Sequence, residues 1–233
     1  MPATACGTLA IGMSVEVNDI LHVLAHELRT PVGIAHGYVR LLLDERLPSD
    51  ADRKRALEQM QKALGRLSDL SHETTSLAAW YEQGRQEQQF ADARGLIERV
   101  ADADYEWPVT VQTDGVPEGA RVRTPDADAL GRALTSMVRA TARELRGVTC
   151  DVVAHTNGDY FELLVGPEDQ IGMLRGGPEA SDAGPLALER GGLGLALVHA
   201  AIVIDAHGAQ RWTMNGSRQT VGLRLPLEER RHL

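Results

Sequence analysis

Two long runs of helical periodicity, separated by a short polar break, constrain the N-terminal third of this chain more than any other feature. In the first run, from about Ser14 to Arg46, apolar residues recur at steps of three, four or seven, as in a helix with one buried face. These residues are Ile20, Leu24, Leu28, Ala35, Tyr38 and Leu42. The segment Leu47-Pro48-Ser49-Asp50 breaks this helix and offers Ser49 or Asp50 as the cap of the next one.

The second run predicts a helix to about Tyr81. Its heptad-like series comprises Leu57, Met60, Leu64, Leu67, Leu70, Thr74, Leu77 and Tyr81. Two helices of about thirty residues joined by a short turn form an antiparallel hairpin, and a lone hairpin leaves each apolar face half covered. Pairing two hairpins into a four-helix bundle covers both faces, so we expect a symmetric homodimer through residues 14–84. The alternative is a hairpin that packs on the C-terminal half of its own chain.

Composition excludes several classes of protein. The chain has 233 residues, 43% of them hydrophobic, which allows two domains. A net charge of −9 offers no basic surface, so we expect no direct binding of nucleic acid. Cys6 and Cys150 have neither disulfide-framework nor metal-ligand spacing, which indicates a reducing, cytoplasmic protein. Because no apolar run reaches about eighteen residues and residues 1–13 do not resemble a signal peptide, we expect no membrane span.

Beyond a short polar hinge at residues 84–89, the pattern changes to mixed helices and strands. Helices are expected near 92–101, 128–145 and 193–206, and strands near 109–113, 121–123, 149–155, 161–165, 210–214 and 221–226. Asn157-Gly158 between two alternating strands is a strong hairpin signal. The prediction is an α+β protein, with a dimeric helical-hairpin domain at 14–84 followed by an α/β sandwich domain at 90–233.

One hexapeptide of the first helix carries chemistry: His26-Glu27-Leu28-Arg29-Thr30-Pro31. His26 and Glu27 lie at the edge of the apolar stripe, with Thr30 one turn beyond His26. An exposed imidazole is largely unprotonated and nucleophilic at pH 7, and Glu27 can hold the proton of its other ring nitrogen. Pro31 is expected to bend the helix just past His26. For a lone helical histidine, the alternative interpretation is a solvated side chain without a role.

The hexapeptide closely resembles the phosphoacceptor box of sensor histidine kinases, in which the histidine carries a phosphoryl group on a ring nitrogen. The resemblance implies that His26, Glu27 and Thr30 are the catalytic residues. Glu27 would act as general base during phosphorylation, and Thr30 would position a water when a partner's phosphoaspartate is hydrolysed. A homodimer and a response-regulator receiver domain are the implied partners. The order of elements in 90–233 resembles the α/β sandwich ATPase domain that follows the phosphoacceptor hairpin in this family.

The resemblance also identifies a partial nucleotide site. Gly191-Gly192-Leu193-Gly194 resembles the second glycine box of the ATPase domain, in which glycines let backbone amides approach phosphates. Gly192, Gly194 and Arg143 are therefore the candidate contacts for ATP. The alternative is a glycine-rich helix start that only packs on the sheet, because fold and nucleotide binding are separable.

Two other boxes of the family are not matched, which counts against ATP and Mg²⁺ as cofactors. The magnesium-holding asparagine would fall at Ala140, which has no oxygen to offer a hard cation. The aspartate that recognises adenine would fall at Gly166. Asp169 restores an adenine contact only if the register is shifted by a few residues. No residue is therefore assigned to a metal.

Three functions remain open from the sequence. The first is a phosphotransferase or phosphatase that exchanges phosphate between His26 and receiver aspartates, with the C-terminal domain as a docking or structural module. The second is an ordinary ATP-dependent histidine kinase core. The third is a non-catalytic dimeric interaction module, although a pure scaffold has no need of Glu27 and Thr30.

Overall fold

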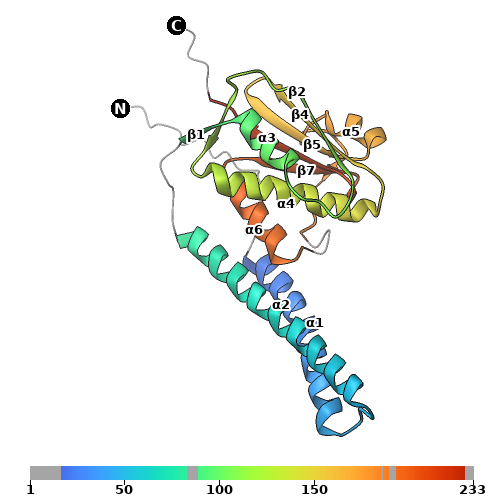
Figure 1. Ribbon diagram of the computed structural model, residues 1–233. Coiled ribbons are helices and arrows are strands. Elements are labelled where there is room, and N and C mark those ends of the chain that lie inside the picture. The colour runs from blue at the N-terminus through green and yellow to red at the C-terminus, as the bar shows by residue number, and fades with distance from the viewer. Residues whose placement is uncertain (1–16, 83–88, 185, 189–192, 229–233) are drawn as a thin grey trace.

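The protein consists of a helical hairpin followed by a mixed α/β sandwich, seen in a computed structural model (Figure 1). The structure describes residues 17–82, 89–184, 186–188 and 193–228. The hairpin arms are α1 (Val17–Leu43) and α2 (Asp50–Glu82), and they pack against each other along their length. The predicted α+β fold, a helical hairpin followed by an α/β sandwich, is confirmed, whereas most of the predicted hinge at 84–89 lies outside the described residues.

Local sequence signals set the ends of the hairpin helices. Ser49 Oγ accepts a hydrogen bond from the backbone N–H of Asp52 at 3.1 Å, so Ser49 caps the first turn of α2 as predicted. Pro31 is buried within α1, and the helix continues through it to Leu43. The predicted bend at Pro31 stays a prediction.

The apolar residues of α2 form two rows rather than one. The buried row consists of Ala56, Ala63, Leu70 and Leu77, spaced by seven residues, and each of these is less than a tenth exposed. The second row contains Leu57 and Leu64, which are 55% and 56% exposed in the single chain. The hairpin therefore buries one face of α2 within the chain and leaves an apolar row on the outside.

The sandwich is built on a six-stranded sheet with the order β2-β4-β5-β8-β7-β6. Its strands are β2 (Val109–Gly115), β4 (Cys150–Asn157), β5 (Tyr160–Gly166), β6 (Ala183–Gly184), β7 (Gln210–Met214) and β8 (Val221–Pro226). Only the β2–β4 pair is parallel among the described strands. The predicted turn after Asn157 is confirmed, with Gly158 at a φ of 59° that favours glycine. A separate antiparallel pair joins β1 (Gln89–Asp92), which the sequence did not predict, to β3 (Arg121–Thr124).

Three helices cover one face of the sheet: α3 (Ala93–Ala101), α4 (Ala127–Leu145) and α6 (Leu195–Ala206). Asp92 and Asp126 cap α3 and α4 through their carboxylates. Alternate residues of β5 point to opposite faces of the sheet, so Leu163 enters the large core under these helices while Leu164 faces the other side.

The second face of the sheet carries a short helix that the sequence did not predict. After β5 the chain forms α5 (Glu168–Leu174) and then the edge strand β6. Ile171 and Leu174 of α5 pack with Leu164, Trp212 and Met214 in a small separate core. The segment following β5 is therefore folded onto the face of the sheet opposite α4 and α6.

The sandwich rests on the hairpin through α6, at the end of the hairpin where α1 begins (Figure 1). Val23 of α1 and Leu70 and Leu77 of α2 belong to the same continuous core as Leu195 of α6. At this end of the hairpin, the alternative expectation holds, because the hairpin packs on the C-terminal half of its own chain. The remaining length of the hairpin stands clear of the sandwich, with Leu57 and Leu64 exposed.

Candidate functional site

His26 lies on the outer surface of α1, with 70% of its side chain exposed. Its Nδ1 is 3.8 Å from Oε1 of Glu27, a separation slightly too long for a hydrogen bond. Thr30 is also exposed and follows one helical turn later, so His26 and Thr30 share one outer surface, with the more buried Glu27 at its edge. The ring nitrogen that does not face Glu27 is Nε2.

Glu27 is held by a residue of the other hairpin arm. Arg66 on α2 donates a hydrogen bond to Glu27 Oε2 at 3.1 Å, and its second terminal nitrogen lies 3.6 Å from Glu73 Oε1. Both carboxylates are mostly buried, and Glu73 Oε2 has no hydrogen-bond partner among the described residues. Burial raises the pKa of Glu73, and the charge of Arg66 opposes that rise.

Sequence reasoning missed Arg66 and Glu73. The two residues are seven apart on α2, so they share a helix face, and this spacing was the only available signal. The register that sets Arg66 level with Glu27 depends on how the two arms pack.

Gly194 contacts Glu27 from the sandwich side. It is the N-cap of α6, with φ of 54° and ψ of −129°. A Cβ built on Gly194 would lie 2.6 Å from Glu27 Cδ, so any side chain at this position would displace the carboxylate. A carboxylate beside the first turn of a helix is favourable because free backbone N–H groups lie there. Gly194 thus lies against Glu27, while Gly192, its partner in the predicted phosphate contact, lies outside the described residues.

The remaining candidate nucleotide contacts are not brought together. Arg143 on α4 forms an ion pair with Glu106 at 3.2 Å. Ala140 has no exposed surface, so its methyl group is part of the core rather than the wall of a cavity. A Cβ at Gly166 would lie 3.0 Å from Thr220 Cγ2, which leaves little room for a larger side chain. Asp169 is on α5, across the sheet from α4 and α6, so a shifted register does not bring it to them.

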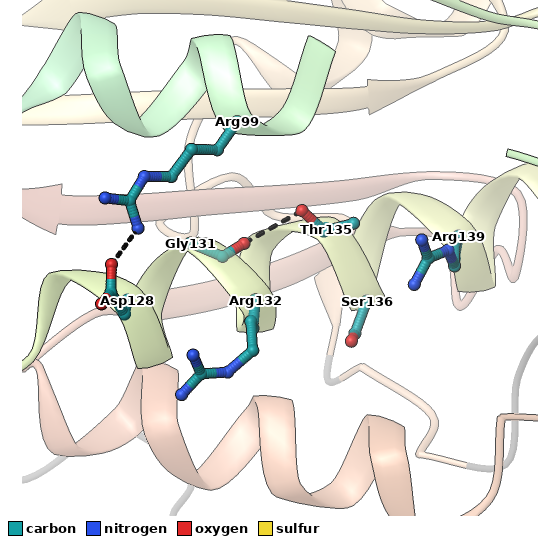
Figure 2. Close-up of a pocket in the computed structure, with 7 residues that line it drawn as sticks. All are labelled: Arg99, Asp128, Gly131, Arg132, Thr135, Ser136 and Arg139. Carbon is teal, nitrogen blue, oxygen red and sulfur yellow. Dashed lines mark hydrogen bonds and ion pairs between the residues drawn. The ribbon is translucent and has the colours of Figure 1, made fainter. Parts of the chain in front are cut away.

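A pocket of about 370 Å³ opens instead between α3 and α4. Its walls are formed by Arg99, Asp128, Gly131, Arg132, Thr135, Ser136 and Arg139. Figure 2 shows Arg99 reaching across from α3 to form an ion pair with Asp128. Arg139 donates to the backbone carbonyl of Asp104 at 3.0 Å. Two of the three arginines are therefore engaged within the protein, and Ala140 does not line this pocket.

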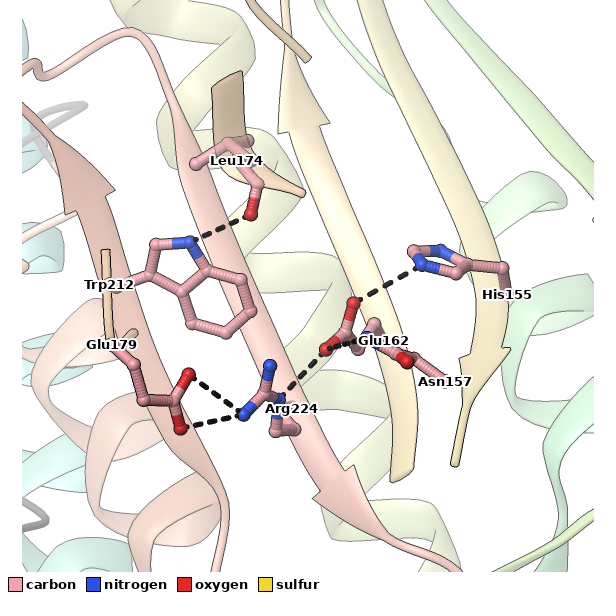
Figure 3. Close-up of polar contacts among 7 residues, drawn as sticks. All are labelled: His155, Asn157, Glu162, Leu174, Glu179, Trp212 and Arg224. Carbon is pink, nitrogen blue, oxygen red and sulfur yellow. Dashed lines mark hydrogen bonds and ion pairs between the residues drawn. The ribbon is translucent and has the colours of Figure 1, made fainter. Parts of the chain in front are cut away.

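A buried polar network holds the segment after β5 on the opposite face of the sheet (Figure 3). Glu162 on β5 is fully buried and lies between His155 Nε2, at 3.2 Å, and Arg224 Nε, which donates to it at 2.8 Å. Arg224 also donates to Glu179 at 2.9 Å, and Glu179 follows α5 in the chain. Burial lowers the pKa of His155 despite the nearby carboxylate. The network ties β4, β5 and β8 to the segment around α5, which is a structural role.

The comparisons agree with this geometry. Residues 16–79 match the family model of the His Kinase A (phospho-acceptor) domain. The structure is similar to that of the Acinetobacter baumannii histidine kinase AdeS, with a TM-score of 0.51 and 18% identity over 86% of this chain and 97% of that one. It is also similar to histidine kinase ThkA, solved in complex with the response regulator TrrA, with a TM-score of 0.53 and 16% identity over 90% of this chain and 60% of that one.

A search of curated proteins gives no significant match to the sequence. Within the described part of the chain, no helix combines the length and the hydropathy that crossing a membrane requires. The hairpin with its phosphoacceptor motif and the sandwich that follows it thus occur together, as in solved histidine kinases. Residues 16–79 are therefore a phosphoacceptor domain of the His Kinase A family, and the chain as a whole has the fold of solved histidine kinases.

Proposed function

We propose that this protein transfers phosphoryl groups through His26 to or from the aspartate of a response-regulator receiver domain, and that ATP is not its phosphoryl donor. The observation that carries the proposal is the exposed His26 beside Glu27 within a phosphoacceptor domain. The sandwich domain then serves as a docking module for the hairpin, as its packing through α6 supports.

The transfer chemistry follows from which ring nitrogen faces Glu27. Nδ1 faces the carboxylate, so it carries the ring proton and Nε2 holds the lone pair. Nε2 attacks the phosphorus of a receiver aspartyl phosphate, the new N–P bond forms, and the bond from phosphorus to the aspartate oxygen breaks. The aspartate leaves as a carboxylate. The ring becomes cationic, and Glu27 stabilises the charge on its Nδ1 side. The reverse transfer follows the same path.

The residues present do not fit ATP and Mg²⁺. Hard cations need oxygen ligands, and Ala140 supplies none at the position where the family resemblance expects one. The backbone at Gly166 packs on Thr220, and Asp169 lies across the sheet. Gly194 is in contact with Glu27, so a phosphate group at the start of α6 would have to replace that contact. No step of the proposed reaction passes through a nucleotide.

We further propose that the protein acts as a homodimer through the hairpin. On α2 the exposed row of Leu57 and Leu64 has no covering partner among the described residues of the chain. On α1, Leu21 and Val32 are 55% and 51% exposed. A second copy related by a two-fold axis would cover these side chains in a four-helix bundle.

The test supplies the label from two sources. In one arm, a receiver domain is phosphorylated with labelled phosphate and mixed with the protein; in the other, the protein receives labelled ATP and Mg²⁺. We expect label from the receiver and none from ATP. His26→Ala should abolish labelling, whereas His22→Ala and His36→Ala, both on exposed positions of α1, should not. Label on His26 from ATP would instead identify an ordinary histidine kinase, and no label in either arm would identify a non-catalytic module.

A further inference from the structure

Arg66 occupies the centre of a charged group that crosses the hairpin. It lies on α2 between two carboxylates, hydrogen-bonded to Glu27 Oε2 at 3.1 Å and 3.6 Å from Glu73 Oε1. Its own side chain is 38% exposed, compared with 22% for Glu27 and 27% for Glu73. One guanidinium therefore serves two carboxylates that are more buried than it is.

The carboxylate of Glu27 is confined on two sides. Arg66 binds Oε2 from α2, and the backbone of Gly194 closes the space on the sandwich side, where even a Cβ would lie 2.7 Å from Oε2. The remaining oxygen, Oε1, is the one that lies 3.8 Å from His26 Nδ1. Since the imidazole is exposed, a small rotation of the ring brings Nδ1 within hydrogen-bond distance of an oxygen that is already in place.

We propose that Arg66 is a positioning residue for phosphoryl transfer, because by binding Glu27 Oε2 it presents Oε1 to His26 Nδ1 and so leaves Nε2 as the nucleophile. Glu73 holds the guanidinium from the far side and keeps it level with Glu27. The inference deepens the proposed function and rests on it.

The charges of the group fit this role. Before transfer, Arg66 with Glu27 and Glu73 carries a net charge of −1 when both carboxylates are ionised. The imidazole ring gains a positive charge as Nε2 bonds to phosphorus, so this negative group faces the charge that develops. Without Arg66, the two carboxylates repel each other, and Glu27 is free to turn away from His26. Arg66 is thus needed to orient the Glu27 carboxylate toward His26. The negative charge that faces the imidazole comes from the carboxylates themselves.

The test compares variants of the 233-residue chain in single-turnover transfer from a phosphorylated receiver domain. Arg66→Ala should slow transfer by roughly tenfold to a hundredfold, since misplacing a catalytic group by about 1 Å costs this much. Arg66→Lys keeps a cation at the same place and should recover most of the rate. Glu73→Gln removes the charge that holds the guanidinium from the far side and should slow transfer less than Arg66→Ala does, because Arg66 remains bonded to Glu27. Arg55→Ala is the matched control, because Arg55 is another α2 arginine, eleven residues before Arg66, and it pairs with Asp52 at 3.9 Å. This variant should transfer phosphate at the wild-type rate.

A second measurement separates positioning from folding. Nitrogen-15 chemical shifts of His26 report which ring nitrogen is protonated. We expect the Nδ1–H form to dominate in the wild type and in Arg66→Lys, and to lose ground to the Nε2–H form in Arg66→Ala. Thermal unfolding identifies any variant that is not folded.

The outcomes distinguish this inference from the proposed function. Failure of the wild type to take label from the receiver overturns the proposed function, and the inference with it. If the wild type is labelled and Arg66→Ala is labelled equally fast, only the role of Arg66 is overturned. If both Arg66→Ala and Arg66→Lys transfer slowly while the His26 tautomer is unchanged, Arg66 has only a structural role. That outcome would also overturn its role as a positioning residue.

Discussion

The substitution Ala140→Asn supplies the amide oxygen that a magnesium site of the family would use. The structure predicts that this substitution destabilises the protein and creates no magnesium site. Ala140 has no exposed surface, and the neighbouring Thr141 is equally buried, with its hydroxyl donating to the backbone carbonyl of Met137. An asparagine side chain at this place has to enter the packed core under α4.

The expected cost has two parts. Burying an amide without hydrogen-bond partners costs about 1–3 kcal/mol in proteins. Forcing extra atoms into a packed core costs about 1–3 kcal/mol more. The free energy of unfolding of Ala140→Asn should therefore fall by about 2–6 kcal/mol, which lowers the melting temperature by at least about 4 °C for a protein of this size.

The assay combines thermal unfolding with calorimetric titration of ATP and Mg²⁺. Ser136→Asn, one turn earlier on α4 and only partly buried, is the matched control and should change stability by about 0.5 kcal/mol or less. Ala140→Asn should be destabilised and should not gain nucleotide binding or autophosphorylation. An Ala140→Asn protein with unchanged stability and Mg²⁺-dependent ATP binding would refute the reasoning, because residue 140 would then face a nucleotide cavity.

Three further outcomes follow from burial. Leu64→Glu places a charge in the proposed dimer interface and should convert the dimer to monomer in analytical ultracentrifugation, at a cost of several kcal/mol; a monomeric wild type at micromolar concentration would exclude the interface. Burial lowers the pKa of His207, so the unfolded state binds its proton more readily; stability in urea should fall as the pH drops below the ordinary value of 6.5, and His207→Gln should reduce that slope, with partly buried His155 among the groups that maintain the rest. Gly222→Ala would set a Cβ 2.1 Å from Trp212 and should cost about 3 kcal/mol or more, whereas Gly33→Ala, with open space around it, should stabilise α1 by up to about 1 kcal/mol in the same denaturation assay.

The sequence alone determined the hairpin, most of the sandwich elements and the phosphoacceptor motif. These features are local: Ser49 caps α2 by accepting a hydrogen bond from a residue three positions on, and the turn after Asn157 joins β4, along which burial alternates, to β5. A helix cap, a helical stripe and a two-residue turn depend on neighbours within a few positions in the chain. The predicted strands at 210–214 and 221–226 match β7 and β8 for the same reason.

The path of the segment after β5 was not readable from its sequence. Gly176, Gly177 and Pro178 are typical of an irregular loop, and the seven residues of α5 are too few for a periodic signal. The segment is held by the fit of Ile171 and Leu174 to the sheet and by the contact of Glu179 with Arg224. Such contacts form only when the sheet exists.

Tertiary structure alone also decided how the surroundings of His26 are arranged. Glu27 and Arg66 are 39 residues apart, and they meet because the turn between α1 and α2 fixes the register of the two arms. Gly194 reaches Glu27 only because α6 packs on the start of the hairpin, with Val23 and Leu70 in the shared core. Periodicity assigns a side chain to a face of its own helix, but the partner across that face is set by the packing of distant segments, for which a single sequence carries no local signal.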